Sequence, residues 1–120
     1  MGKILIVDDA AFMRLRCSRI LEEAGHMALE AENGYEAVKA YQDSRPDGVL
    51  MDITMPVMDG LAALKEIKRI DPVARVAMVT ALGQQSAVME ALRAGAVDFV
   101  VKPFDKDRML AAVERILSTD

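Results

Sequence analysis

The chain has 120 residues and a formal net charge of −4, and 52% of its residues are hydrophobic, 28% charged and 4% aromatic. This apolar content excludes a disordered chain, and the mixed charges without a basic stripe argue against a surface for nucleic acid or anionic membranes. The length fits one domain with a single aliphatic core, which we expect to span residues 1–120.

Five short apolar runs alternate with segments of helical periodicity. The runs start 24, 21, 27 and 23 residues apart, which is the spacing of successive strand–helix units rather than of hairpins. The predicted strands are KILIV from Lys3, MALEA from Met27, GVLM from Gly48, RVAMV from Arg75 and DFVV from Asp98.

Helix signals fill the gaps between these strands. The first helix is predicted to end at Gly25, a typical C-cap residue. Asn33 with Glu36 three residues later resembles a capping box that opens the second helix. The third helix is predicted to follow MDG at 58–60 and to stop before Pro72, which cannot continue a helix.

The last two helices follow the same pattern. We expect the fourth to end at Gly95 and the fifth to begin after Asp105 as N-cap. The residues expected to face the core are Val88, Ala91 and Leu92 in the fourth helix and Leu110, Val113 and Leu117 in the fifth.

Five strand–helix units predict an α/β fold, with a parallel sheet between two helical layers in a three-layer sandwich. The first, third and fourth strands are apolar on both faces, as interior parallel strands are. The second and fifth carry polar residues and are expected at the edges, which predicts the flavodoxin-like order 2-1-3-4-5. Ligands of such sheets bind at the carboxyl ends of the strands, where the order reverses between strands one and three.

Polar residues gather at that end of the predicted sheet. Asp8 and Asp9 follow the first strand, Asp52 the third, Thr80 the fourth and Lys102 the fifth. Three converging carboxylates repel one another, and a single lysine does not neutralise them. We therefore expect a divalent cation, and Mg²⁺ prefers oxygen ligands in octahedral geometry while keeping several waters.

The metal ligands follow from this arrangement. Asp9 and Asp52 are expected to bind Mg²⁺ directly and Asp8 through water. The backbone carbonyl of Thr54, just past Asp52, is expected to complete the ligands that the protein supplies.

A metal beside a lysine and a hydroxyl is typical of a phosphoryl site. In phosphoryl transfer the protein mainly positions the group and neutralises charge on its oxygens. Mg²⁺, Lys102 and Thr80 could each bind one oxygen, with Asp52 as the nucleophile that forms an acyl phosphate.

Four motifs at the ends of the predicted strands carry a resemblance to a known family. They are DD at 8–9, MDITMPVMDG at 51–60, TALG at 80–83 and KPF at 102–104. In type and spacing they resemble the receiver domains of response regulators, and the resemblance covers essentially all 120 residues. Within that family the chain is similar to the stand-alone chemotaxis regulators.

The resemblance implies a role for each matching position. These roles are the phosphoacceptor at Asp52, an acid pair at Asp8 and Asp9, a switch hydroxyl at Thr80 beside Ala81, a phosphate-binding lysine at Lys102 and a switch aromatic at Phe99. It also implies a cis peptide bond between Lys102 and Pro103. Because such a domain catalyses only its own phosphorylation and dephosphorylation, we expect no enzyme acting on an external substrate.

A movement of Thr80 toward the phosphoryl group would change the space beside Phe99, which alternates with Val100 on the predicted edge strand. We therefore expect the signal to leave through the fourth helix, the fifth strand and the fifth helix. The residues expected on this output surface are Met89, Arg93, Val101, Arg108 and Ala112.

Two departures from the family pattern bear on its tuning. Phe99 lacks the hydroxyl of the tyrosine that some relatives have at this position. The two positions associated with the dephosphorylation rate hold Thr54 and Leu82, and an apolar side chain does not orient an attacking water. The resemblance therefore implies a longer-lived phosphoryl state.

We expect a cytoplasmic signalling switch, phosphorylated by a histidine kinase or phosphotransfer domain and acting by contact with a downstream protein. The lone Cys17 favours a reducing compartment, and no apolar run approaches the ~18 residues of a membrane span. The leading expectation is a monomeric chemotaxis regulator acting on a target such as the flagellar motor switch. A single-domain phosphorelay intermediate and a receiver excised from a longer regulator are the alternatives.

Two other classes of protein share parts of this pattern. A Mg²⁺-dependent phosphatase of the haloacid-dehalogenase type would have a second aspartate two residues after Asp52, where this chain has Thr54. A flavin mononucleotide carrier would have a Thr-, Ser- and Gly-rich loop after the first strand, where this chain has two acids. Both classes are therefore disfavoured.

Overall fold

The computed structural model describes residues 2–118, and its strands form one parallel sheet. The strands are β1 (Lys3–Val7), β2 (Met27–Ala31), β3 (Gly48–Asp52), β4 (Val76–Thr80) and β5 (Asp98–Val101). Their order is β2-β1-β3-β4-β5, with all neighbouring pairs parallel. The predicted fold is confirmed, including the edge positions of β2 and β5. The three strands with neighbours on both sides are buried along almost their whole length, whereas the two edge strands are partly exposed.

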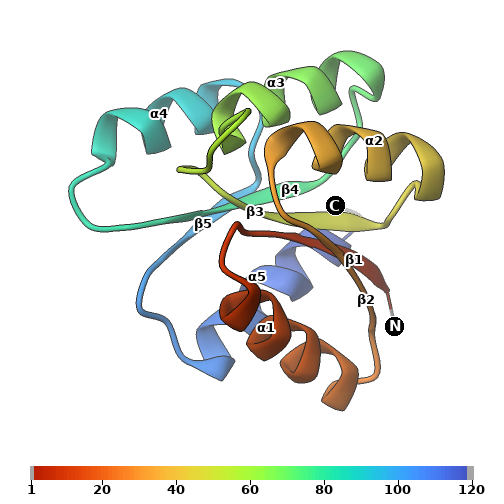
Figure 1. Cartoon of the computed structure of the whole chain (residues 1–120). Helices are drawn as coiled ribbons and strands as arrows, with labels where there is room; N and C mark the ends of the chain where they lie inside the picture. Colours follow the sequence, from red (N-terminus) through yellow and green to blue (C-terminus); the bar gives the residue numbers. More distant parts are fainter. Residues whose placement is uncertain (1, 119–120) are drawn as a thin grey trace.

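The helices lie in two layers on either side of this sheet. They are α1 (Ala11–Glu23), α2 (Gly34–Ser44), α3 (Gly60–Ile70), α4 (Gln85–Arg93) and α5 (Lys106–Leu117). Figure 1 shows α1 and α5 on one face and α2, α3 and α4 on the other. A separate cluster of buried side chains fills the space on each face. Among the described residues, no helix is long and apolar enough to span a membrane.

Local capping explains where these helices begin and end. The Asn33 side chain accepts a hydrogen bond from the Glu36 amide at 2.8 Å, whereas the Glu36 carboxylate accepts from the Glu32 amide, so half of the expected capping box forms. Asp105 caps α5 as predicted. Gly25 and Gly95 have φ values of 90° and 107° and lie two residues beyond the helix ends, so the helices stop slightly earlier than expected.

Two predictions about the helical core were wrong. Leu92 is 38% exposed, because only Val88 and Ala91 form the buried face of α4, while Leu92 lines an open pocket beside Phe99. On α5 the buried face is formed by Met109, Ala112, Val113 and Ile116, and Leu110 and Leu117 only flank it. Ala112 is completely buried and is therefore not part of an output surface.

Candidate functional site

The site is built around Asp52, the last residue of β3 and only 7% exposed. The chain folds back over this strand end at Gly60, whose amide donates a hydrogen bond to the Ile53 carbonyl at 2.7 Å. A Cβ atom at Gly60 would lie 1.9 Å from the Asp52 carbonyl oxygen. Glycine is therefore required at this position for the loop to pass so close to the strand.

Lys102 connects the carboxyl ends of the neighbouring strands β1 and β3. Its Nζ donates hydrogen bonds to Asp8 Oδ2 at 3.1 Å and to Asp52 Oδ2 at 3.2 Å. Asp8 is 5% exposed, and its second oxygen accepts from the Ala10 amide at 2.9 Å. The peptide bond from Lys102 to Pro103 is cis, as the resemblance implied. One ammonium group thus bridges two buried carboxylates that are 44 residues apart in the sequence.

Burial and charge set the protonation of this cluster. Burial raises the pKa of Asp52, and the charge of Asp8 raises it further, while Lys102 and a hydrogen bond from the Thr54 amide oppose the shift. Burial alone would lower the pKa of Lys102, but its hydrogen bonds to Asp8 and the charges of both carboxylates outweigh burial and raise it. The lysine is therefore held as a cation beside a carboxylate that is costly to ionise.

The third acid completes an oxygen-rich cluster. Carboxylate oxygens of Asp8, Asp9 and Asp52 lie within 4.8 Å of one another, and Asp9 is exposed. Hard oxygen donors with one side open to solvent suit Mg²⁺, which retains several waters. The residues that are present therefore fit a magnesium ion.

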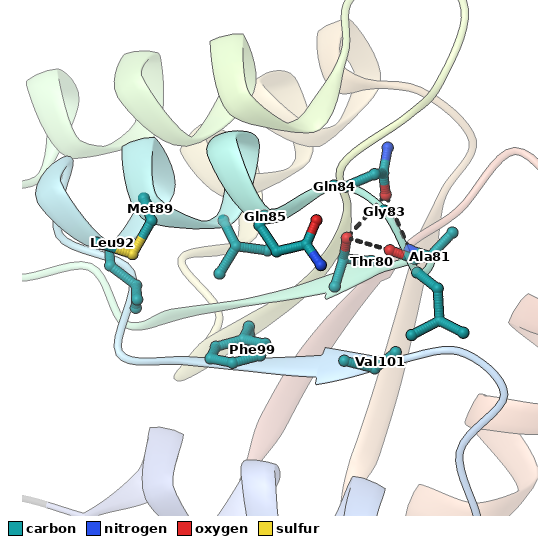
Figure 2. A pocket seen from close by; sticks show the side chains of 11 residues that line it. Thr80, Ala81, Gly83, Gln84, Gln85, Met89, Leu92, Phe99 and Val101 are labelled. Atoms are coloured by element: carbon teal, nitrogen blue, oxygen red, sulfur yellow. Dashed lines mark hydrogen bonds between the residues drawn. The ribbon is translucent and has the colours of Figure 1, made fainter.

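Thr80 ends β4 and is 2% exposed. Its hydroxyl donates to Gln84 Oε1 at 2.7 Å, and the Ala81 amide donates to the same oxygen at 2.8 Å (Figure 2). Gln84 Nε2 in turn donates to Thr54 Oγ1 at 2.6 Å. Sequence reasoning missed Gln84, since no motif marks a glutamine after the TALG segment and its partners become visible only in the folded chain.

Phe99 lies at the rim of an open pocket of about 300 Å³ between α4 and β5. Figure 2 shows its ring in a row with Val101 and opposite Met89 and Leu92. Phe99 is 37% exposed, whereas its neighbour Val100 is buried, which is the alternation expected on an edge strand. This side of the molecule therefore presents apolar side chains to solvent.

The remaining residues of the predicted output surface are polar. Arg93 is exposed at the end of α4. Arg108 on α5 donates to the Phe99 carbonyl at 2.6 Å and pairs with Asp98 at 3.3 Å. Arg108 therefore connects α5 to the edge strand that carries Phe99.

This fold, with an acid cluster and a lysine at the carboxyl ends of its strands, defines a class of protein. The chain belongs to the response regulator receiver domain family, whose model matches residues 4–114. It is 56% identical over 117 residues to the chemotaxis protein CheY of Bacillus subtilis, which covers 97% of this chain and 98% of that protein. It is 52% identical to CheY of Thermotoga maritima, with coverage of 97% and 98%.

Solved structures agree with this assignment. The crystal structure of the NtrX receiver domain from Brucella abortus has a TM-score of 0.92 and 38% identity, and the match covers 98% of this chain and 99% of that one. The match to a longer NtrX chain covers 27% of that protein. This chain is therefore a two-component receiver domain closely related to CheY, a signalling module of a family that binds Mg²⁺ at clustered acids.

Proposed function

We propose that this domain accepts a phosphoryl group on Asp52 from the phosphohistidine of a histidine kinase or phosphotransfer domain. The observation that carries the proposal is the bridge from Lys102 to Asp8 and Asp52, at 3.1 and 3.2 Å, inside a cluster of three acids. A buried carboxylate beside a fixed cation is poised to act as a nucleophile toward an anionic group.

A magnesium ion would be held by Asp9 and Asp52 directly, by Asp8 through water and by the Thr54 carbonyl. When bound, Mg²⁺ neutralises negative charge on the oxygens of the transferred group. The accessible position of Asp9 supports this arrangement, because a ligand at the open side of the cluster leaves room for water and for the phosphoryl group.

The protein's own residues position the reaction. A carboxylate oxygen of Asp52 forms a bond to phosphorus while the bond from phosphorus to the histidine nitrogen breaks, and the imidazole leaves with the electron pair. The Lys102 ammonium, the Thr80 hydroxyl and the Ala81 amide donate to the phosphoryl oxygens as charge redistributes. Catalysis is limited to the domain's own phosphorylation and dephosphorylation.

Loss of the phosphoryl group is expected to be slow. Leu82 is 81% exposed at the mouth of the site and has no polar group to orient an attacking water. The Thr54 hydroxyl, at the other position associated with this step, accepts a hydrogen bond from Gln84. Neither side chain thus offers a free base to water.

Phosphorylation would act on a downstream protein through α4, β5 and α5, at Met89, Phe99, Arg93, Val101 and Arg108. The similarity to CheY supports chemotaxis-type signalling, with the flagellar motor switch as one target class. The match to one part of the longer NtrX chain favours a second candidate, a receiver within a larger regulator. A single-domain phosphorelay intermediate would use the same chemistry. In each case we expect the domain to act as a monomer.

Incubation with acetyl phosphate and Mg²⁺ tests the phosphoacceptor. Intact-mass measurement should show one added phosphoryl group that alkali removes, and Asp52→Asn should abolish it. Asp59→Asn is a matched control in the same loop, because asparagine also caps helices and Asp59 caps α3. A label that persists in Asp52→Asn, or that survives alkali, would contradict the assignment.

A further inference from the structure

Gln84 joins the loop after β4 to the loop after β3. Its Oε1 accepts from the Thr80 hydroxyl at 2.7 Å and from the Ala81 amide at 2.8 Å. Its Nε2 donates to Thr54 Oγ1 at 2.6 Å. A single side chain therefore occupies three polar groups at the mouth of the site (Figure 2).

The chemistry of the partners determines the orientation of this amide. The Ala81 N–H can only donate, so the atom that faces it must be the carboxamide oxygen. The nitrogen then faces Thr54 Oγ1, which has lone pairs to accept its proton. These three hydrogen bonds of the Gln84 side chain are thus satisfied in one orientation.

The local backbone favours this contact over helix capping. Gly83 has a φ of 90° in open space, a conformation that glycine adopts without strain and that turns the chain back toward Thr80. Gln84 stands at the N-cap position of α4, yet its side chain makes no hydrogen bond to that helix. Its hydrogen bonds connect loops and do not cap the helix.

Two partners of Gln84, the Thr80 hydroxyl and the Ala81 amide, are the groups that donate to the phosphoryl oxygens in the proposed function. This inference rests on that function. The Thr80 hydroxyl has one proton and two acceptors within reach, Gln84 Oε1 at 2.7 Å and the Ala81 carbonyl at 3.1 Å. The shorter contact is to Gln84, and a proton donated there cannot also be donated to a phosphoryl oxygen. We propose that Gln84 is a positioning residue that holds Thr80 and Ala81 in the unphosphorylated arrangement, and that a phosphoryl group on Asp52 displaces its carboxamide oxygen.

Removal of Gln84 should therefore favour the phosphorylated arrangement. Gln84→Ala deletes hydrogen bonds that exist only in the unphosphorylated arrangement. A phosphoryl analogue that binds the other arrangement then no longer has to break those bonds. We expect the apparent Kd for a phosphoryl analogue to fall about three- to tenfold, in keeping with the net strength of one or two hydrogen bonds.

Beryllofluoride with Mg²⁺ is the probe, and its Kd is measured for wild type, Gln84→Ala and Gln84→Asn. Asparagine keeps the amide but is one methylene shorter, so it should also bind the probe more tightly. Gln85→Ala is the matched control, since Gln85 is the exposed neighbour on α4 and lines the same pocket. Its Kd should equal that of wild type, and thermal unfolding verifies that all variants are folded.

A double variant separates positioning from a general effect on the loop. In a Thr80→Ala background, Gln84→Ala should tighten binding less than it does in wild type, because one of the competing donors is gone. Equal or weaker binding by Gln84→Ala relative to wild type would overturn this inference while leaving the proposed function intact. Failure of the wild-type domain to bind beryllofluoride would overturn the proposed function, and this inference with it.

Discussion

Asp52 and Asp8 are buried acids that share one ammonium group. Neither carboxylate has a cation of its own among the residues described, and burial and the charge of Asp8 raise the pKa of Asp52. Sites of this kind lower the stability of the fold in exchange for reactivity. Removal of the buried charge at Asp52 should therefore raise stability while it abolishes the proposed function.

The first prediction concerns Asp52→Asn in EDTA. The amide carries no charge to desolvate, and Lys102 keeps its bond to Asp8 at 3.1 Å, so the variant should be more stable at neutral pH by about 0.5–2 kcal/mol. Urea unfolding followed by circular dichroism measures the difference. Asp59→Asn, at an exposed cap, should change stability by less than about 0.5 kcal/mol.

The same pair of proteins should differ in pH dependence. The folded pKa of Asp52 is raised above 3.8, first by burial and then by Asp8. The stability that the protonated carboxyl contributes is fully present below 3.8, the pKa of the unfolded chain, and is lost as pH rises through the higher folded pKa. The advantage of Asp52→Asn should thus grow with pH across that window and then level off. An advantage that shrinks with pH would contradict the burial of this charge.

A second prediction at this scale concerns Asp9→Ala. Mg²⁺ that binds only the folded state raises the melting temperature by mass action, and loss of a direct ligand should remove most of that increase. Asp9 is exposed, so the variant should melt like wild type in EDTA. Asp43→Ala, an exposed acid on α2, serves as the control. Identical melting of the wild type in EDTA and in Mg²⁺ would rule out the metal site.

At the scale of elements, α4, β5 and α5 form the surface that we expect to respond. Phe99 lies on the edge strand, 37% exposed, with an open pocket of about 300 Å³ between it and α4. If β5 were an interior strand, a further strand and its helix would cover the pocket beside Phe99. Because β5 is an edge strand, the Phe99 ring and α4 have room to move. The edge strand is therefore the place where a change at Thr80 can reach solvent.

The prediction for these elements is a change in NMR resonances when beryllofluoride and Mg²⁺ bind. Residues such as Met89, Val101 and Arg108 should shift, far from Asp52 in sequence, with a coupling of about 1–3 kcal/mol. Thr80→Ala should reduce these distant shifts while the probe still binds. If the changes stay in the loops around Asp52, the signal does not leave by this surface.

At the scale of the whole molecule, two cores on opposite faces of one sheet hold the site together. Cys17 reports on the face covered by α1 and α5, because it is 6% exposed and burial raises its pKa from 9.0 to about 11. At neutral pH such a thiol carries about 100-fold less thiolate than an ordinary one. Its reaction therefore depends on opening of the fold.

The prediction is that an aromatic disulfide reagent labels Cys17 very slowly in the native domain and at once in urea. Mg²⁺ should slow native labelling further, since it stabilises the closed state. Labelling rates with and without Mg²⁺ are compared with the unfolding free energies measured in the same buffers. Rapid labelling of the fully helical protein would show that α1 does not seal this core.

Much of this architecture was predictable from local signals. Alternating strand and helix periods are properties of neighbouring residues, so the sheet order and the edge positions of β2 and β5 followed from them. The acids and Lys102 come directly at or after strand ends, and parallel strands bring their carboxyl ends to one edge. Their convergence was therefore predictable from the sequence once the order of the strands was inferred.

Tertiary structure alone decided which side chains are covered and which loops touch. Leu92 and Ala112 both follow helical periodicity, yet one is exposed and the other buried, because burial depends on which element lies opposite. Gln84 contacts Thr54, 30 residues away, through a turn at Gly83. Periodicity reports the secondary structure of a segment, whereas these contacts depend on how segments distant in sequence pack, which no local pattern records.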